Sequence, residues 1–211
     1  MSKEPIRIYG RGKFKKESIV FGADQSEILY DVKEYERFIK SCEHAVRKDD
    51  RYTAYIGKLK EGGMNRCAFL GNIKEDDMVK LEMHHGPIFN LFDICDIVTH
   101  AMLKRKSLTD LTTFDIADLV LEEHRLNNIM IVMLSKTVHK GNHNKKGSRS
   151  IFVNIKATFG RVDRFIDRWS DGMEDEHWDM IIHYMEELEK AGTNSVDNGL
   201  METKKRLERF K

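Results

Sequence analysis

The chain has 211 residues, 36 of them basic and 35 acidic, and a net charge of +1 argues against attraction of polyanions by a whole-molecule field. Apolar residues make up 40%, enough for a folded core, and no apolar stretch approaches the roughly 20 residues that a transmembrane helix needs. Three cysteines without Cys-x-x-Cys spacing exclude a zinc knuckle and predict reduced, mostly buried thiols. The charged N-terminus lacks the apolar stretch of a secretion signal, so no membrane partner and a cytoplasmic location are expected.

The first part of the chain is predicted to be a basic arm, a helix and three strands. Residues 1–32 combine lysine and arginine with glycine, a composition typical of an irregular arm. Residues 33–48 have apolar side chains every three or four positions, which predicts an amphipathic helix. Three short apolar or alternating runs predict antiparallel strands at 52–59, 67–73 and 78–83.

Two helices are predicted after these strands. Apolar residues at helical spacing indicate them at 90–105 and 113–125. Thr112 or Thr113 is expected to cap the second helix, because a threonine oxygen can accept the free amides of a first turn.

One buried strand and a helical C-terminal part follow. The apolar run 129–134 predicts the strand, and Ser135 is expected to cap the helix after it. A polar linker at 144–150 precedes two further predicted helices, at 159–169 and 174–190. The aromatic residues of the first of these helices are expected in the core.

The chain thus divides into three predicted parts. Residues 1–32 are the arm, and residues 33–150 are a central domain with a helical insertion at about 88–126. Residues 151–211 are a C-terminal helical region.

Two pairs of histidines are the residues most suggestive of chemistry. His84 and His85 end a strand-like run, and His139 and His143 lie four residues apart on the helix predicted after the buried strand. Residues four apart share one face of a helix, so these two imidazoles can bind one metal ion. If the two strands next to these histidines pair, His84 would lie beside the helix as a third ligand.

Together, the Glu-x-His-His segment, an Asn, a buried strand and a helical His-x-x-x-His resemble the HNH, or ββα-metal, nucleases. The resemblance covers 81–85 and 127–143, with a long helical insertion between them. It implies an α+β fold whose ββα-metal hairpin-and-helix core carries additional helices. It also implies three metal ligands, which are His84, His139 and His143. His85 corresponds to the general base, and Asn127 or Asn128 to the Asn that orients it, with Asn128 taken as the candidate.

By this resemblance the chain is expected to be a metal-dependent DNA endonuclease that uses one divalent ion. The ion would neutralise charge at the scissile phosphate while His85 takes a proton from water. Imidazole ligands favour Zn²⁺, and Mg²⁺ or Mn²⁺ stay open as alternatives. Five cations near the metal helix are expected to contact DNA phosphates: Lys136, Lys140, Lys145, Lys146 and Arg149.

Two non-catalytic alternatives stay open. One is a protein-binding module on the same scaffold, with the inserted helices at 90–105 and 113–125 as its interface. The other is a DNA binder without turnover, whose binding would weaken with salt. Four other histidines on predicted helices are expected to face solvent or to cap helices: His100, His124, His177 and His183.

Overall fold

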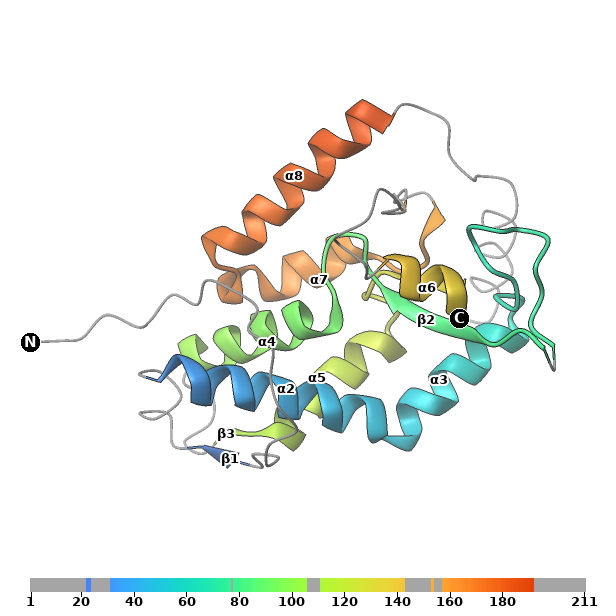
Figure 1. The fold of residues 1–211 in the computed structure, drawn as a ribbon. Coiled ribbons are helices and arrows are strands. Elements are labelled where there is room, and N and C mark those ends of the chain that lie inside the picture. The colour runs from blue at the N-terminus through green and yellow to red at the C-terminus, as the bar shows by residue number, and fades with distance from the viewer. Residues whose placement is uncertain are drawn as a thin grey trace, which may run out of the picture.

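The computed structural model describes residues 22–23, 31–76, 78–105, 111–142, 153 and 157–191. Within these ranges the fold is α+β, as predicted, with helices and two small antiparallel strand pairs, β1–β3 and β2–β4, of which β1–β3 lies at the edge (Figure 1). The elements in chain order are β1 (Gly22–Ala23), α2 (Val32–Lys48), α3 (Asp50–Glu61), β2 (Leu81–His85), α4 (Leu91–Arg105), β3 (Leu111–Thr112), α5 (Thr113–Arg125), β4 (Ile131–Ser135), α6 (Lys136–Asn142), α7 (Val162–Trp169), the 3₁₀ helix η2 (Ser170–Gly172) and α8 (Asp175–Ala191). The division of the whole chain into three parts stays a prediction.

Aspartates start the first two helices. The carboxylate of Asp31 accepts hydrogen bonds from the first amides of α2, whose bounds agree with the predicted helix. Asp49 ends α2 and accepts from a first-turn amide of α3, so the second helix begins at once. The strand predicted at 52–59 is therefore wrong. Tyr52 and Leu59 are both buried and lie seven residues apart, which puts them on one face of a helix.

The segment 67–73 forms turns, and the strand predicted there is also wrong. The amide of Cys67 donates to the carbonyl of Ile73 at 2.8 Å, so the segment folds back on itself. The amide of Ala68 donates to the carbonyl of Met133 at 2.8 Å, which joins this loop to β4. All three cysteines of the chain are free and buried, as predicted.

β2 and β4 form the antiparallel pair expected from the sequence, and α6 follows β4 directly. The register pairs Leu81 with Ser135 at one end and His85 with Ile131 at the other. β2 begins three residues later than the predicted strand and ends two residues after it, so it contains both histidines. The predicted cap at Ser135 is wrong, because its buried hydroxyl oxygen has no hydrogen-bond partner among the described residues.

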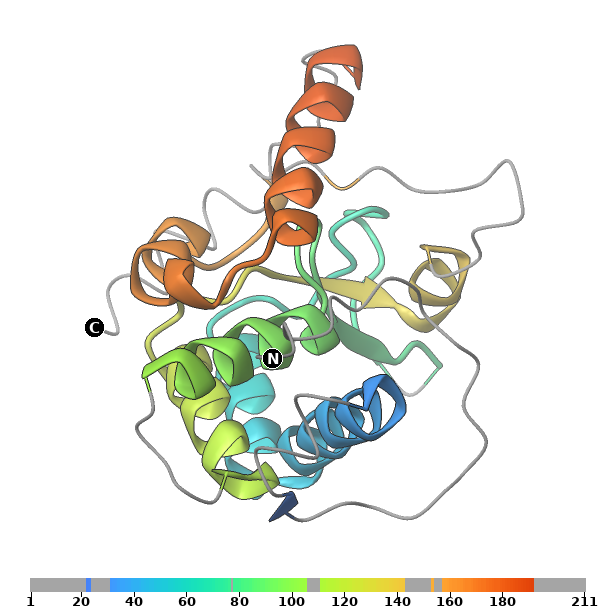
Figure 2. The same cartoon turned by 90° about the vertical axis from the view of Figure 1, so that its left-hand side faces the viewer.

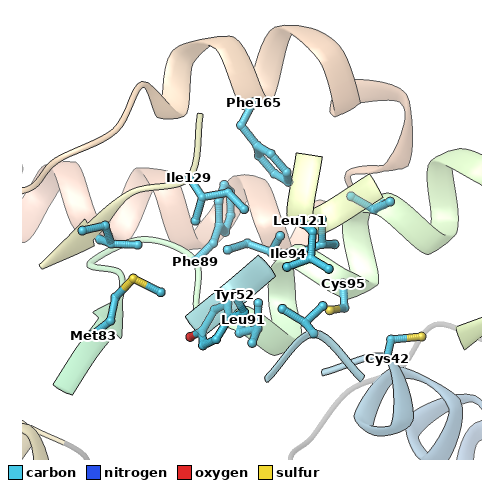
Figure 3. Close-up of a cluster of buried hydrophobic side chains, with 14 of the residues drawn as sticks. Cys42, Tyr52, Met83, Phe89, Leu91, Ile94, Cys95, Leu121, Ile129 and Phe165 are labelled. Carbon is cyan, nitrogen blue, oxygen red and sulfur yellow. The ribbon is translucent and has the colours of Figure 1, made fainter. Parts of the chain in front are cut away.

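The inserted helices α4 and α5 lie in the core, where they pack against each other and against α2. Thr112 and Asp115 form a reciprocal capping box at the start of α5. Figure 3 shows side chains from several elements that meet in this core, among them Cys42 of α2, Ile94 of α4, Leu121 of α5 and Phe165 of α7. The apolar faces of the two helices are thus buried inside the protein, and of their large apolar side chains only Phe114 is more than half exposed.

The chain enters α7 through an extended segment. Phe159 forms an isolated antiparallel bridge with Ile131, so it lies beside β4 and not in the helix predicted to include it. α7 begins at Val162 and runs directly into η2, which packs against α4. The aromatic residues of this region are buried, as predicted: Phe159, Phe165 and Trp169.

α8 has the bounds predicted for the last helix, and it projects from the body of the protein (Figure 2). Its first turn is attached to α4 by His177. The Nδ1 atom of His177 accepts a hydrogen bond from the backbone amide of Glu174 at 3.1 Å, and Nε2 of His177 lies 3.1 Å from the carboxylate of Asp96. His177 therefore caps the helix, as predicted, while its ring is buried against the core.

Gly160→Ala is expected to lower the free energy of unfolding by at least about 2 kcal/mol. Gly160 has φ +112°, and an added Cβ would lie 2.7 Å from the carbonyl carbon of Ile129. Neither the backbone conformation nor the neighbouring backbone can accommodate it. The matched control is Gly57→Ala in the middle of α3, where no atom lies within 4 Å of the added Cβ. Denaturant unfolding should show the control equal to wild type or more stable by up to about 1 kcal/mol, and an equal loss in both variants would contradict this account.

Candidate functional site

A cavity of about 390 Å³ opens beside β2 and is walled by elements that are far apart in the sequence. Three histidines predicted as site residues line it together: His84, His85 and His139. α2 contributes four charged side chains to the same cavity: Glu36, Lys40, Glu43 and Arg47. The sequence analysis missed this charged face. Its spacing of four, three and four residues is the helical signal that could have revealed it.

His84 and His139 come together where β2 meets α6. Their ring centroids are 5.1 Å apart, at an interplanar angle of 71°. Nδ1 of His139 lies 2.6 Å from a carboxylate oxygen of Glu82, two residues before His84 on the same strand. A carboxylate can only accept, so Nδ1 of His139 carries a proton and donates it to Glu82.

The third predicted ligand, His143, lies outside the described residues. The ranges that the structure describes contain no group of three or more His, Cys, Asp or Glu side chains placed to hold a metal ion. Of the three predicted ligands, only His84 and His139 are thus seen as neighbours in the described part of the chain.

His85 contacts a histidine that the sequence analysis did not select. Its Nε2 atom lies 3.0 Å from Nε2 of His124 on α5, and Nδ1 of His124 lies 2.8 Å from the carbonyl oxygen of Val120. His124 is 1% exposed, so the prediction that it faces solvent is wrong. It follows Val120 and Leu121 by four and three residues, and this spacing puts it on the apolar face of α5.

Burial keeps both rings of this pair neutral. Removal from water lowers the pKa of His124 to about 4, against a smaller opposite effect of its hydrogen bond to Val120. The pKa of His85 is well below its ordinary value, first because of burial and then because a charged His85 would be repelled by a protonated His124 and by Arg47. At neutral pH each ring therefore has one N–H and one lone pair.

Asn128 has a different partner from the one predicted. Its side-chain amide donates to the carboxylate of Glu123 at 2.7 Å, and Glu123 also pairs with Arg168 at 2.9 Å. No hydrogen bond joins Asn128 to His85 in the part of the chain that the structure describes. The alternative, Asn127, lies at φ 55° and accepts a 3.3 Å hydrogen bond from the hydroxyl of Tyr55.

The predicted phosphate contacts are only partly within the described ranges. Lys136 and Lys140 are exposed on α6. The other three predicted phosphate contacts lie outside the described residues: Lys145, Lys146 and Arg149. Inside the cavity, Arg47 pairs with Glu43 at 2.7 Å on the same helix.

A family model described as bacteriophage G278-like virion protein matches residues 13–209. The chain belongs to this family. Searches of curated proteins and of solved structures gave no match. The matched range includes every described helix and strand, so the histidine cavity lies within the region that defines the G278-like virion protein family.

The family description names a virion protein and specifies no chemistry. No helix among the described residues of this family member combines the length and the apolar character needed to cross a membrane. Lys40 and Arg47 are the two cations beside the histidines, and carboxylates outnumber them in the cavity lining: Glu36, Glu43, Asp93, Asp96 and Glu176.

Proposed function

We propose that this virion-family protein is a metal-dependent DNA endonuclease of the HNH type, with a ββα-metal core made of β2, β4 and α6. The observation that carries the proposal is the antiparallel strand pair followed directly by a helix, with His84 and His139 brought together at 5.1 Å beside a cavity. The order of these elements is the one expected from the resemblance to HNH nucleases.

The donor set fits a divalent metal ion. His84 and His139 supply imidazoles, and the 2.6 Å contact of Glu82 with Nδ1 of His139 has the form that commonly orients a metal-binding histidine. His143, four residues after His139, is the proposed third ligand. Neutral nitrogen ligands favour Zn²⁺, while Mg²⁺ and Mn²⁺ also serve phosphodiester hydrolysis. When bound, the ion would supply positive charge at the scissile phosphate.

The residues of the chain divide the remaining work between them. His85 would take a proton from the attacking water, because a neutral imidazole has a lone pair for this purpose. The bound ion would offset the carboxylates that line the cavity and attract the phosphate group, and Lys136 and Lys140 of α6 would contact the DNA backbone outside it. DNA is the proposed substrate because the resemblance to HNH nucleases implies it, and the exposed lysines of α6 could contact its phosphates.

Plasmid cleavage with and without metal tests this function. The purified protein is expected to nick or cut plasmid DNA in Mg²⁺, Mn²⁺ or Zn²⁺, to lose the activity with a chelator, and to regain it when metal is added back. His139→Ala should abolish cleavage, while His183→Ala, at an exposed position of α8, should leave it unchanged. Intact plasmid with all three metals and a normally folded protein would overturn the proposal. Salt-dependent DNA binding in that case would favour the non-catalytic alternative.

A further inference from the structure

We propose that His124, on the inserted helix α5, is the positioning residue of His85, and that it holds the His85 ring in the tautomer whose lone pair is on Nδ1. This inference rests on the proposed function, in which His85 is the base. It assigns to the insertion a direct part in the site, although the sequence analysis had treated the insertion only as a possible protein interface.

A chain of two hydrogen bonds fixes the tautomer. The carbonyl oxygen of Val120 can only accept, so Nδ1 of His124, 2.8 Å away, must carry a proton. A neutral imidazole has a single N–H, so Nε2 of His124 is an acceptor. His85 must therefore donate from its own Nε2 across the 3.0 Å contact, which leaves the lone pair of His85 on Nδ1.

The neutral state of His124 is consistent with this direction of donation. Burial brings its pKa down to about 4, so it carries no second proton at neutral pH. A doubly protonated His124 would instead donate from Nε2, and the lone pair of His85 would then be used within the pair. The water-activating nitrogen is available only while His124 is an acceptor.

The surrounding rings hold both histidines in place. Tyr52 stacks against His85 with centroids 6.2 Å apart and an interplanar angle of 14°. The rings of Tyr52 and Tyr55 contact His124 edge-on, with centroids 5.5 and 5.4 Å away. Rotation of either imidazole would have to displace these aromatic side chains of α3, so the hydrogen-bonded orientation is fixed by packing.

Asn128 does not supply this positioning. Its amide nitrogen is bound to Glu123 at 2.7 Å, and its side-chain oxygen is buried without a hydrogen-bond partner among the described residues. His124 makes the only side-chain hydrogen bond to the His85 ring within the described ranges. The ring of His85 is thus oriented from α5.

Nitrogen-15 NMR of the histidine rings tests the inference on the full-length protein, without any need for cleavage. Wild-type His85 is expected to have the proton on Nε2 and the lone pair on Nδ1. His124→Gln keeps an acceptor near the position of Nε2, so this tautomer should persist. His124→Asn puts the amide near the position of Nδ1, where it can reach Val120 but not His85, and His85 should then become a mixture of tautomers.

Cleavage rates provide the second readout. His124→Asn is expected to lower the rate of plasmid cleavage by roughly 100-fold, the order of effect of a misplaced catalytic group, with unchanged affinity for DNA. His124→Gln should retain most of the activity, because the acceptor is rescued. A purely structural role would affect both variants according to their stability, which thermal unfolding measures.

Two results would overturn the inference. One is a wild-type His85 with its proton on Nδ1, which can be observed even if no variant folds. The other is an unchanged His85 tautomer in a folded His124→Asn protein. A wild-type protein that has the expected tautomer but leaves DNA intact would overturn the proposed nuclease function instead, so the two failures are distinguishable.

Discussion

His85→Gln is expected to lower the rate of metal-dependent plasmid cleavage by about 10²- to 10⁴-fold, the usual contribution of a positioned general base. A glutamine amide has no lone pair basic enough to take a proton from water. Its NH₂ group can still donate to His124 across the 3.0 Å contact now made by the imidazole. The variant therefore removes the base and keeps the buried hydrogen bond.

The choice of glutamine matters because His85 is 5% exposed. Alanine at this position would leave Nε2 of His124 without a donor and would open a cavity, at a cost of about 1–3 kcal/mol for the unpaired group alone. Single-turnover cleavage, thermal unfolding and metal titration should be measured on the same preparation. The expected result is lost cleavage with metal binding and unfolding temperature close to wild type. Wild-type cleavage by His85→Gln would remove His85 from the mechanism.

The sequence predicted the strand pair at the site because the segment before His84 alternates apolar and polar residues and the segment before Ser135 is a continuous apolar run. The runs before His85 and before Ser135 are short, buried and followed by polar residues, so their pairing required little tertiary information. The pairing puts His84 opposite Val132 near the start of β4, so its proximity to His139 also requires that α6, after the end of β4, fold back along β2.

α3 was predicted wrongly because propensity and periodicity disagree in its sequence. Tyr52, Thr53 and Tyr55 favour a strand by residue type, whereas the buried positions at Tyr52 and Leu59 have helical spacing. The capping bond of Asp49 decided in favour of the helix. An aspartate at a helix start is a local signal in the sequence, and Asp49 could have predicted the start of α3.

The role of His124 depended on tertiary structure, as did that of Asn128. His124 is flanked in sequence by Glu123 and Arg125, so a local view predicts an exposed residue. Only its distance from Val120 indicates the buried face of α5. Asn128 binds Glu123 because α5 packs against the segment before β4, and no pattern in the sequence predicts this contact.

Arg168→Met is expected to lower the free energy of unfolding by about 3 kcal/mol, the lower end of the cost of removing one partner from a buried ion pair. The side chain of Glu123 is 1% exposed, and its carboxylate contacts Arg168 at 2.9 Å and Asn128 at 2.7 Å. Without the arginine, a buried negative charge would keep only the amide of Asn128. The expected loss of stability is at the lower end of this range because the Arg168 side chain is 45% exposed, so water already screens the ion pair.

A second variant and a matched control separate the unpaired charge from lost packing. Arg164→Met changes an exposed arginine of the same helix that forms no ion pair within the described ranges, and its effect should stay within about 0.5 kcal/mol. Glu123→Gln combined with Arg168→Met removes the charge and keeps an acceptor for Asn128, so it should recover more than half of the loss. If the double variant is as unstable as Arg168→Met alone, the cost is one of packing against Trp169, over whose ring Arg168 lies at 5.5 Å. Because Glu123 immediately precedes His124 in α5, a shift of this ion pair would also disturb the positioning of His85, and cleavage by Arg168→Met should fall more than its folded fraction predicts.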